Sequence, residues 1–122
     1  EALKYSIKAF EIEPNDYLVK YNYAKVLIAN GDNLLAIKLL RQILNADIDD
    51  IAYGIHGEGL KYAKHIINDS IYLIGISYLN CRKYKTAYKY LFKHLENRQK
   101  GIYSDFSRAQ TLKKISTCIK NR

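Results

Sequence analysis

Few residues in this sequence would interrupt a helix: its 122 residues include one proline and six glycines. Such a composition is typical of a mostly helical chain. The sequence also lacks an apolar run of the roughly 18 residues that a membrane-spanning helix needs. We therefore expect an all-α protein with no membrane span in this segment.

Cysteine is scarce as well, and the two cysteines are Cys81 and Cys118. Their spacing matches neither a metal-binding nor a redox motif. We expect two ordinary thiols in a reducing compartment, which favours a cytoplasmic location. Tryptophan is absent, whereas 12 residues are tyrosine. A tyrosine ring with its polar tip suits both protein interfaces and the interior of stacked helices.

Charge is distributed unevenly along the chain. Residues 1–50 contain 6 Lys and Arg against 8 Asp and Glu, a sum of −2. Residues 51–122 contain 14 against 4, a sum of +10. The second half is therefore the part expected to attract an acidic partner.

Apolar residues recur at helical spacing in several consecutive segments. Pro14 ends the first helix, and Gly31 makes a tight turn between the second and third. Ser104 and Asp105 are expected to cap the last helix. The predicted apolar stripe of that helix consists of Phe106, Ala109, Leu112, Ile115 and Ile119.

The predicted helices span residues 1–13, 17–30, 33–46, 58–80, 83–97 and 105–120.

Alanines mark a repeat in the first part of the chain, where Ala2 and Ala36 are 34 positions apart. That period is typical of stacked helix-turn-helix arrays. A later copy is displaced, because Ala36 and Ala87 are 51 positions apart, which is 34 plus 17. The extra residues either pack outside the array or lengthen the next helix. An unbroken apolar stripe from Leu60 to Tyr78 favours one long helix, although Asn68-Asp69-Ser70 would also suit a new helix start.

The repeat resembles the tetratricopeptide repeat family. In that family small residues stand where paired helices cross, and Ala24 and Ala36 occupy those positions here. Leu27 occupies the position of the large apolar residue that the family has late in the first helix. The departures are Lys20, Ile48 and Arg82, where the family favours tryptophan, proline and glycine. The resemblance covers about 80 of the 122 residues.

The resemblance implies an α-solenoid of antiparallel helix pairs, with about six or seven helices in a right-handed superhelical stack. We expect a single domain over residues 1–122, and a chain that opens within a repeat and belongs to a longer array. Its predicted parts are the second half of a truncated repeat (1–16), a repeat (17–50), an insertion that extends the next helix (51–68), a repeat (69–100) and a terminal capping helix (101–122).

Members of this family bind other proteins, so the resemblance implies a module that holds a peptide or helix segment of a partner in its concave groove. A short helical turn is expected near Asp50–Tyr53, in the loop that leads into the long helix. The residues that the resemblance places on the groove are Leu18, Tyr21, Asn22, Lys25 and Ile28 in one repeat and Asp69, Tyr72, Ile76 and Leu79 in the displaced one.

The sequence predicts neither an enzyme nor a cofactor or metal site. The segment His56-Gly57-Glu58-Gly59 lacks an identifiable nucleophile or paired carboxylate. The three histidines His56, His65 and His94 do not form a compact set of metal ligands.

Two alternatives to groove binding remain open at this point. A basic surface of Arg82, Lys85, Lys89 and Lys93 could dock nucleic acid or an acidic protein. Like charges at this spacing usually mark a solvated helix face, so nucleic acid is the less favoured partner. Alternatively, the chain is an architectural segment of a longer array with no ligand of its own.

Overall fold

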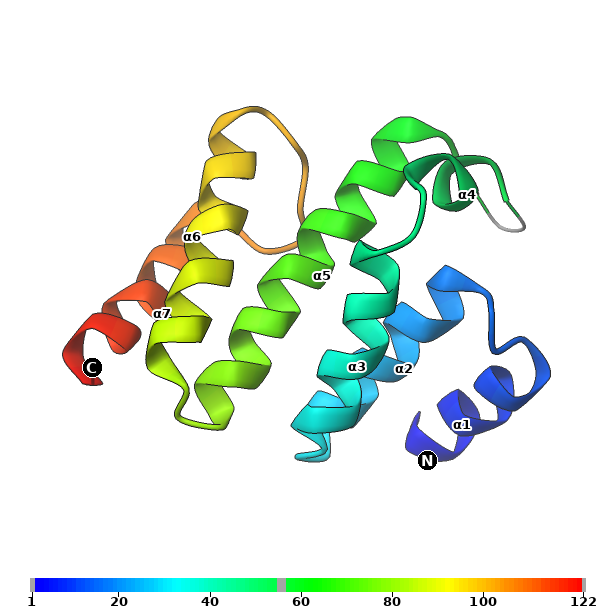
Figure 1. Cartoon of the computed structure of the whole chain (residues 1–122), viewed down its shortest axis with the longest axis horizontal. Helices are drawn as coiled ribbons and strands as arrows, with labels where there is room; N and C mark the ends of the chain where they lie inside the picture. Colours follow the sequence, from blue (N-terminus) through cyan, green and yellow to red (C-terminus); the bar gives the residue numbers. More distant parts are fainter. Residues whose placement is uncertain (1, 55–56, 122) are drawn as a thin grey trace.

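A computed structural model describes residues 2–54 and 57–121, and these residues form seven helices and no strand (Figure 1). The predicted all-α class is therefore confirmed. The helices are α1 (Ala2–Ile12), α2 (Tyr17–Ala29), α3 (Asn33–Leu44), α4 (Ile48–Tyr53), α5 (Leu60–Asn80), α6 (Tyr84–Gln99) and α7 (Arg108–Asn121).

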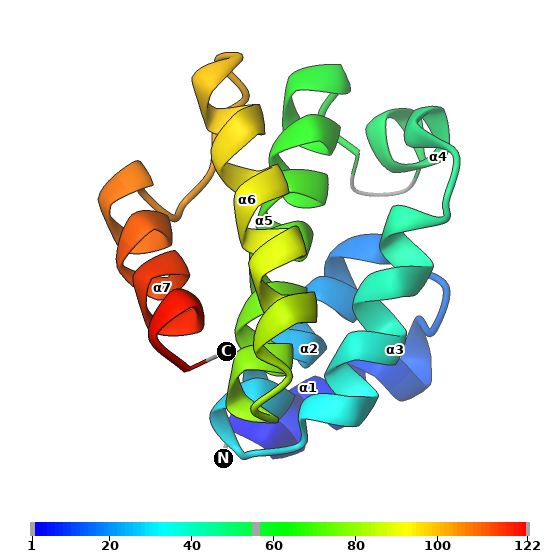
Figure 2. The same ribbon diagram turned by 60° about the vertical axis from the view of Figure 1, so that its left-hand side comes forward.

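Helix α5 is the longest and lies at the centre of the molecule. It packs against α3 on one side and α6 on the other, and it also contacts α2 and α4 (Figure 1). The ends are formed by α1, which packs on α2, and α7, which packs on α6 (Figures 1 and 2). None of the helices in the described ranges has the combination of length and hydropathy needed to cross a bilayer.

The 21 residues of α5 run without a break through Asn68, Asp69 and Ser70. All three side chains are buried. The Ser70 hydroxyl donates to the Ile66 carbonyl oxygen at 2.7 Å, and the other two side chains bond to neighbouring elements. These polar residues therefore do not start a new helix, because each finds a partner inside the fold.

The turn after α2 is closed by backbone hydrogen bonds. The Asp32 N–H donates to the Leu27 carbonyl oxygen at 2.8 Å, and Gly31 takes a φ of 84°. The helix thus ends with one residue in the left-handed conformation, and glycine is the residue favoured at that position.

The turn after α5 repeats this geometry 51 residues later. The Lys83 N–H donates to the Tyr78 carbonyl oxygen at 2.9 Å, and Arg82 takes a φ of 60°. The backbone angles of the next residue also agree, with φ −90° and ψ 68° at Asp32 and φ −91° and ψ 70° at Lys83. Arg82 therefore adopts the left-handed conformation that Gly31 has in the earlier turn.

Replacing Arg82 by glycine is expected to stabilise the protein by about 0.5–1 kcal/mol, since the left-handed conformation costs a residue with a Cβ roughly 1–2 kcal/mol. The matched change Gly31→Ala is expected to destabilise it by about 1 kcal/mol. A Cβ at Gly31 would meet no atom within 4 Å, so only the backbone contributes. Urea unfolding measures both changes in stability. A loss of stability in Arg82→Gly would contradict the left-handed conformation assigned to Arg82.

Buried positions also recur at this 51-residue spacing. At Gly75 an added Cβ would lie 2.8 Å from Leu91 Cγ, so α5 and α6 approach closely at this residue. Ala24 is the equivalent residue on α2 and is fully buried. The equivalent buried pairs are Ala24 and Gly75, Ala36 and Ala87, Leu40 and Leu91, and Ile43 and His94.

The last helix begins three residues later than predicted. The Ser107 Oγ accepts from the Gln110 N–H at 3.1 Å, and the Gln110 Oε1 accepts from the Ser107 N–H at 2.7 Å. This reciprocal capping box starts α7 at Arg108. The predicted cap at Ser104 and Asp105 is wrong, because both residues bond to Asp69 instead.

The buried face of α7 also differs from the predicted stripe. The buried residues are Thr111, Ile115 and Cys118, whereas Leu112 and Ile119 are 48% and 47% exposed. Only part of the predicted stripe is therefore correct. The helix is rotated because Thr111 Oγ1 bonds to the buried ring of His94, at 2.8 Å from its Nδ1. Cys118 and Cys81 are free thiols.

Candidate functional site

The residues predicted to line the groove fall into two groups. Tyr21 and Tyr72 are 3% and 4% exposed, and Asp69 is fully buried, so the prediction that these three face an open groove is wrong. The others remain accessible in whole or in part, and they are Leu18, Asn22, Lys25 and Ile28 on α2 and Ile76 and Leu79 on α5.

Tyr72 is covered by the segment between α6 and α7. The Phe106 ring stacks on the Tyr72 ring with centroids 4.1 Å apart and planes 12° apart. The His94 ring packs beside it, with centroids 5.0 Å apart. The segment over residues 102–106, here called the α6–α7 segment, thus occupies the face of α5 that was expected to be open.

Tyr21 is held against α5 by its hydroxyl group, which donates to Asp69 Oδ2 at 3.1 Å. Burial raises the pKa of Tyr21, and the neighbouring negative charge of Asp69 raises it further. The phenol is therefore a neutral donor at physiological pH. The Lys25 ammonium lies over the outer face of the ring, 4.8 Å from its centroid.

Asp69 is the centre of a hydrogen-bond network that joins α2, α5 and the α6–α7 segment. Its Oδ1 accepts from the Ser104 hydroxyl and, at 3.1 Å, from the Asp105 N–H. Burial raises the pKa of the Asp69 carboxyl, and the hydrogen bond from Ser104 and the nearby His65 offset part of that rise. The carboxylate is thus desolvated but surrounded by donors.

Ser104 continues this network to α6 and α7. Its Oγ lies 2.9 Å from His94 Nε2, and His94 Nδ1 lies 2.8 Å from Thr111 Oγ1. A neutral His94 with its proton on Nε2 satisfies the network, because Thr111 then donates to His94, His94 to Ser104 and Ser104 to Asp69. Burial lowers the pKa of His94 to about 4, with a smaller contribution from the charge of Arg98.

Serine, histidine and aspartate meet here, but their order differs from that of a catalytic triad. In a triad the histidine bridges serine and aspartate, so that it can take the serine proton. Here Ser104 bridges His94 and Asp69, and Ser104 is only 3% exposed. These three side chains therefore fasten helices together and present no accessible nucleophile.

His65 lies at the outer edge of this network. Its Nε2 is 3.0 Å from Asp69 Oδ2 and 3.1 Å from Asp105 Oδ1. The Tyr103 ring meets the His65 ring edge-on, with centroids 4.8 Å apart. The four-residue spacing of His65 and Asp69 on a predicted helix could have signalled this contact, whereas nothing in the sequence places Asp105 beside them.

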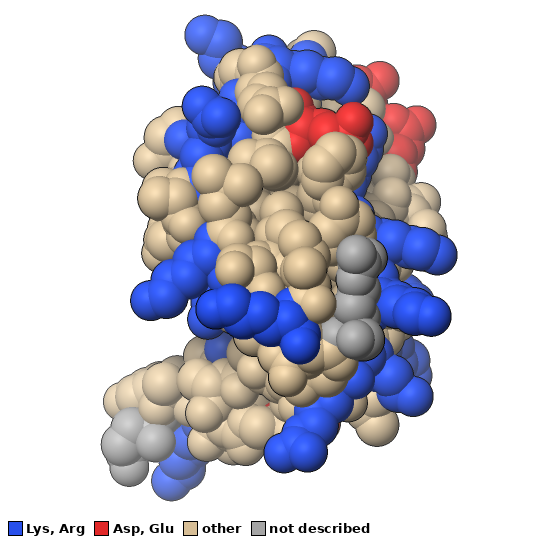
Figure 3. Space-filling view, turned by 90° about the vertical axis from the view of Figure 1, so that its left-hand side faces the viewer, with Lys and Arg blue, Asp and Glu red and all other residues tan. Residues whose placement is uncertain are grey.

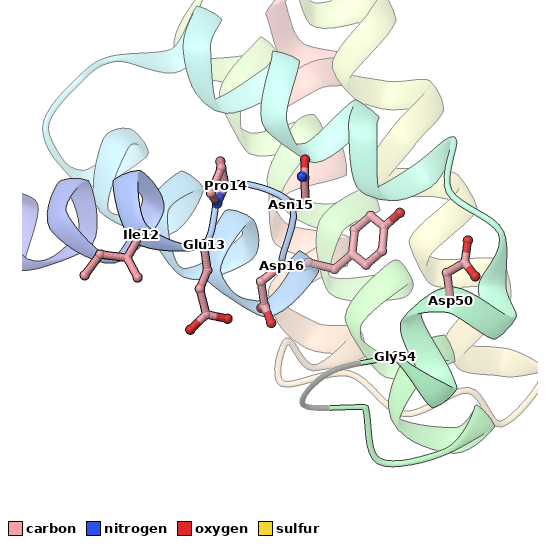
Figure 4. Close-up of a pocket in the computed structure, with 8 residues that line it drawn as sticks. Ile12, Glu13, Pro14, Asn15, Asp16, Asp50 and Gly54 are labelled. Carbon is pink, nitrogen blue, oxygen red and sulfur yellow. The ribbon is translucent and has the colours of Figure 1, made fainter.

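A separate pocket of about 480 Å³ lies between the α1–α2 turn and α4 (Figure 4). Three carboxylates, those of Glu13, Asp16 and Asp50, are among its lining residues. Asp16 also caps α2, since its Oδ1 accepts from the Val19 N–H at 2.9 Å. The pocket was not predicted, and the complete lining is Ile12, Glu13, Pro14, Asn15, Asp16, Tyr17, Asp50 and Gly54.

The predicted glycine-rich segment continues from α4. His56 lies outside the described residues. The Gly57 N–H donates to the Gly54 carbonyl oxygen at 2.9 Å, and the Gly59 N–H donates to that of Ala52 at 2.9 Å. The glycines therefore serve the turn between α4 and α5.

The predicted basic surface residues are all exposed, and they are Arg82, Lys85, Lys89 and Lys93. A shallow depression of about 290 Å³ adjoins them at residues 82–86. At the end of the molecule formed by α7, Lys and Arg side chains lie around a mostly uncharged central area, with a small patch of Asp and Glu in its upper part (Figure 3). The positive charge of the second half of the chain is thus available to solvent.

Comparisons with protein-family models, with curated proteins and with solved structures found no match. The functional assignment therefore depends on the internal geometry of the chain.

Proposed function

We propose that this chain is a tetratricopeptide-like helical-repeat module that binds a segment of another protein. The recurrence of turns and buried positions at 51 residues supports this proposal most strongly. A repeat of this kind cannot bury its apolar face alone and stacks on its neighbours. We propose antiparallel helix pairs in a right-handed stack. The predicted insertion at 51–68 is only partly an extension of α5, because residues 60–68 belong to α5 whereas residues 51–53 belong to the separate short helix α4.

The recurrence also indicates which part of the groove is open. Residues Lys25 and Ile76 are 51 positions apart, as are Ile28 and Leu79, and all four retain accessible surface. The equivalent pair one turn earlier is Tyr21 and Tyr72, and both are buried. We therefore place the binding surface on the C-terminal halves of α2 and α5.

Asn22 is assigned to a different surface from the rest of the predicted set. It lines a hollow of about 230 Å³ together with Tyr5, Ser6, Ala9 and Val19 on α1 and α2. Its side chain therefore faces α1. The proposed groove combines aliphatic side chains with the ammonium of Lys25, which suits a partner helix with an apolar face and an acidic residue.

A photo-crosslinking amino acid at position 29, which is exposed and one turn after Lys25 on α2, would identify the partner, and calorimetry would then compare variants of the chain. Lys25→Glu and Ile76→Ser are each expected to weaken binding by about 10-fold or more. Lys113→Glu on α7 is a matched control for charge and should change the affinity less than about two-fold.

Binding through the basic surface would give the opposite response to these substitutions. If it bound the partner, the triple variant Lys85→Glu, Lys89→Glu and Lys93→Glu would abolish binding, and affinity would fall steeply with salt. If the isolated chain captured no partner at all, a purely architectural role would be favoured.

A further inference from the structure

Three metal-ligating side chains meet where the α6–α7 segment crosses α5. They are His65 and Asp69, one turn apart on α5, and Asp105 from the segment. One ligand atom from each lies within 4.8 Å of the other two. His65 Nε2 is 3.0 Å and 3.1 Å from the two carboxylate oxygens, separations close to those between neighbouring ligands of a single ion.

The first indication of a bound ion is the environment of the His65 ring nitrogen. Nε2 is buried and makes no hydrogen bond, although two carboxylate oxygens lie nearby. The direction of an N–H bond at Nε2 is therefore unsuited to donating a hydrogen bond to either oxygen. A buried nitrogen without a partner is unfavourable, and an ion between it and the carboxylates would supply one.

The charge at this place is the second sign. Asp69 is fully buried, and its described hydrogen bonds come from Tyr21, Ser104 and the Asp105 N–H, none of which is cationic. A second carboxylate, that of Asp105, lies beside it. His65 can supply at most one positive charge against these two carboxylates, whereas a divalent cation would neutralise both.

The surrounding contacts hold the three side chains in place. Donors on two sides fix the Asp69 carboxylate, and Tyr103 fixes the plane of the His65 ring. Hydrogen bonds to a ligating carboxylate are the usual support of a metal site.

We propose that His65, Asp69 and Asp105 form a binding site for a divalent transition-metal ion, with Zn²⁺ as the best fit. One imidazole and two carboxylates suit Zn²⁺ better than Mg²⁺ or Ca²⁺, which prefer oxygen ligands only. Asp105 is 55% exposed, so a fourth position is open to water. A bound ion would pin the α6–α7 segment onto α5, independently of any partner in the groove.

The test is a titration of the intact, metal-stripped chain with Zn²⁺, followed by calorimetry and by thermal unfolding. We expect one ion per chain and an unfolding temperature that rises with Zn²⁺ concentration. His65→Gln and Asp105→Asn are each expected to weaken binding at least about 10-fold. Both side chains are partly exposed, so circular dichroism can verify that the variants fold.

Asp50→Asn is the matched control, because it removes a carboxylate from the separate acidic pocket. Its Zn²⁺ affinity should equal that of the unmodified chain. Cobalt gives an independent readout, since tetrahedral Co²⁺ bound by nitrogen and oxygen shows visible bands without a thiolate charge-transfer band. Saturable binding absent below about 100 µM Zn²⁺, or equal in His65→Gln, would overturn the proposal.

Discussion

Replacing Asp69 by alanine is expected to lower the free energy of unfolding by about 3 kcal/mol or more. The substitution leaves three donors without an acceptor, namely the hydroxyls of Tyr21 and Ser104 and the Asp105 N–H. Tyr21 and Ser104 are both buried, so water cannot easily replace the carboxylate. The relief of a desolvated charge offsets only part of this loss.

Urea unfolding in the presence of a chelator measures this effect without interference from metal ions. Asp69→Asn is the control, because an amide keeps the volume and one acceptor oxygen, and it should cost less than the alanine variant. The two variants should also differ in near-ultraviolet circular dichroism, which reports the packing of Tyr21 and Tyr72. An alanine variant as stable as the unmodified protein would show that the network contributes little.

Acidification from pH 6.5 to pH 4 is expected to remove about 3 kcal/mol of stability through His94 alone. Burial lowers the pKa of His94 from 6.5 to about 4 in the folded protein. The unfolded chain therefore takes up the proton first as pH falls. Stability decreases below pH 6.5, and this contribution is complete once the pH is below the folded pKa.

His94→Gln separates this contribution from the others. Glutamine can still bond to Ser104 or Thr111 but does not titrate, so its stability should depend less on pH over this window. The raised pKa of Asp69 acts in the opposite direction, because a carboxyl that binds its proton more tightly when folded gains stability on acidification. Asp69 is present in both proteins, so the difference between their curves isolates His94, and parallel curves would contradict the assignment.

The helices were largely readable from the sequence because they depend on local patterns. Pro14, Gly31 and the stripe from Leu60 to Tyr78 placed helix ends and the long α5 correctly to within a few residues. The last helix was placed less well. Its rotation depends on His94, a residue on another helix, and on Ser104, whose side chain bonds to Asp69 rather than to the helix start.

The exposure of the predicted groove residues could be predicted only in part for the same reason. Helical spacing put Tyr21 and Tyr72 on the predicted groove faces of their helices. Spacing says nothing of what lies opposite, and Phe106, 34 residues after Tyr72, covers it. The contact of His65 with Asp105 likewise depends on the path of the α6–α7 segment, which no short-range pattern in the sequence encodes.

The two equivalent turns have similar backbone geometry but different residues. Asn30, Gly31 and Asp32 in one turn correspond to Cys81, Arg82 and Lys83 in the other, and no residue is shared although the backbone angles nearly coincide. Two different three-residue sequences thus form one turn geometry. The recurrence lies in dihedral angles and buried positions rather than in residue identities, apart from small residues such as Ala36 and Ala87.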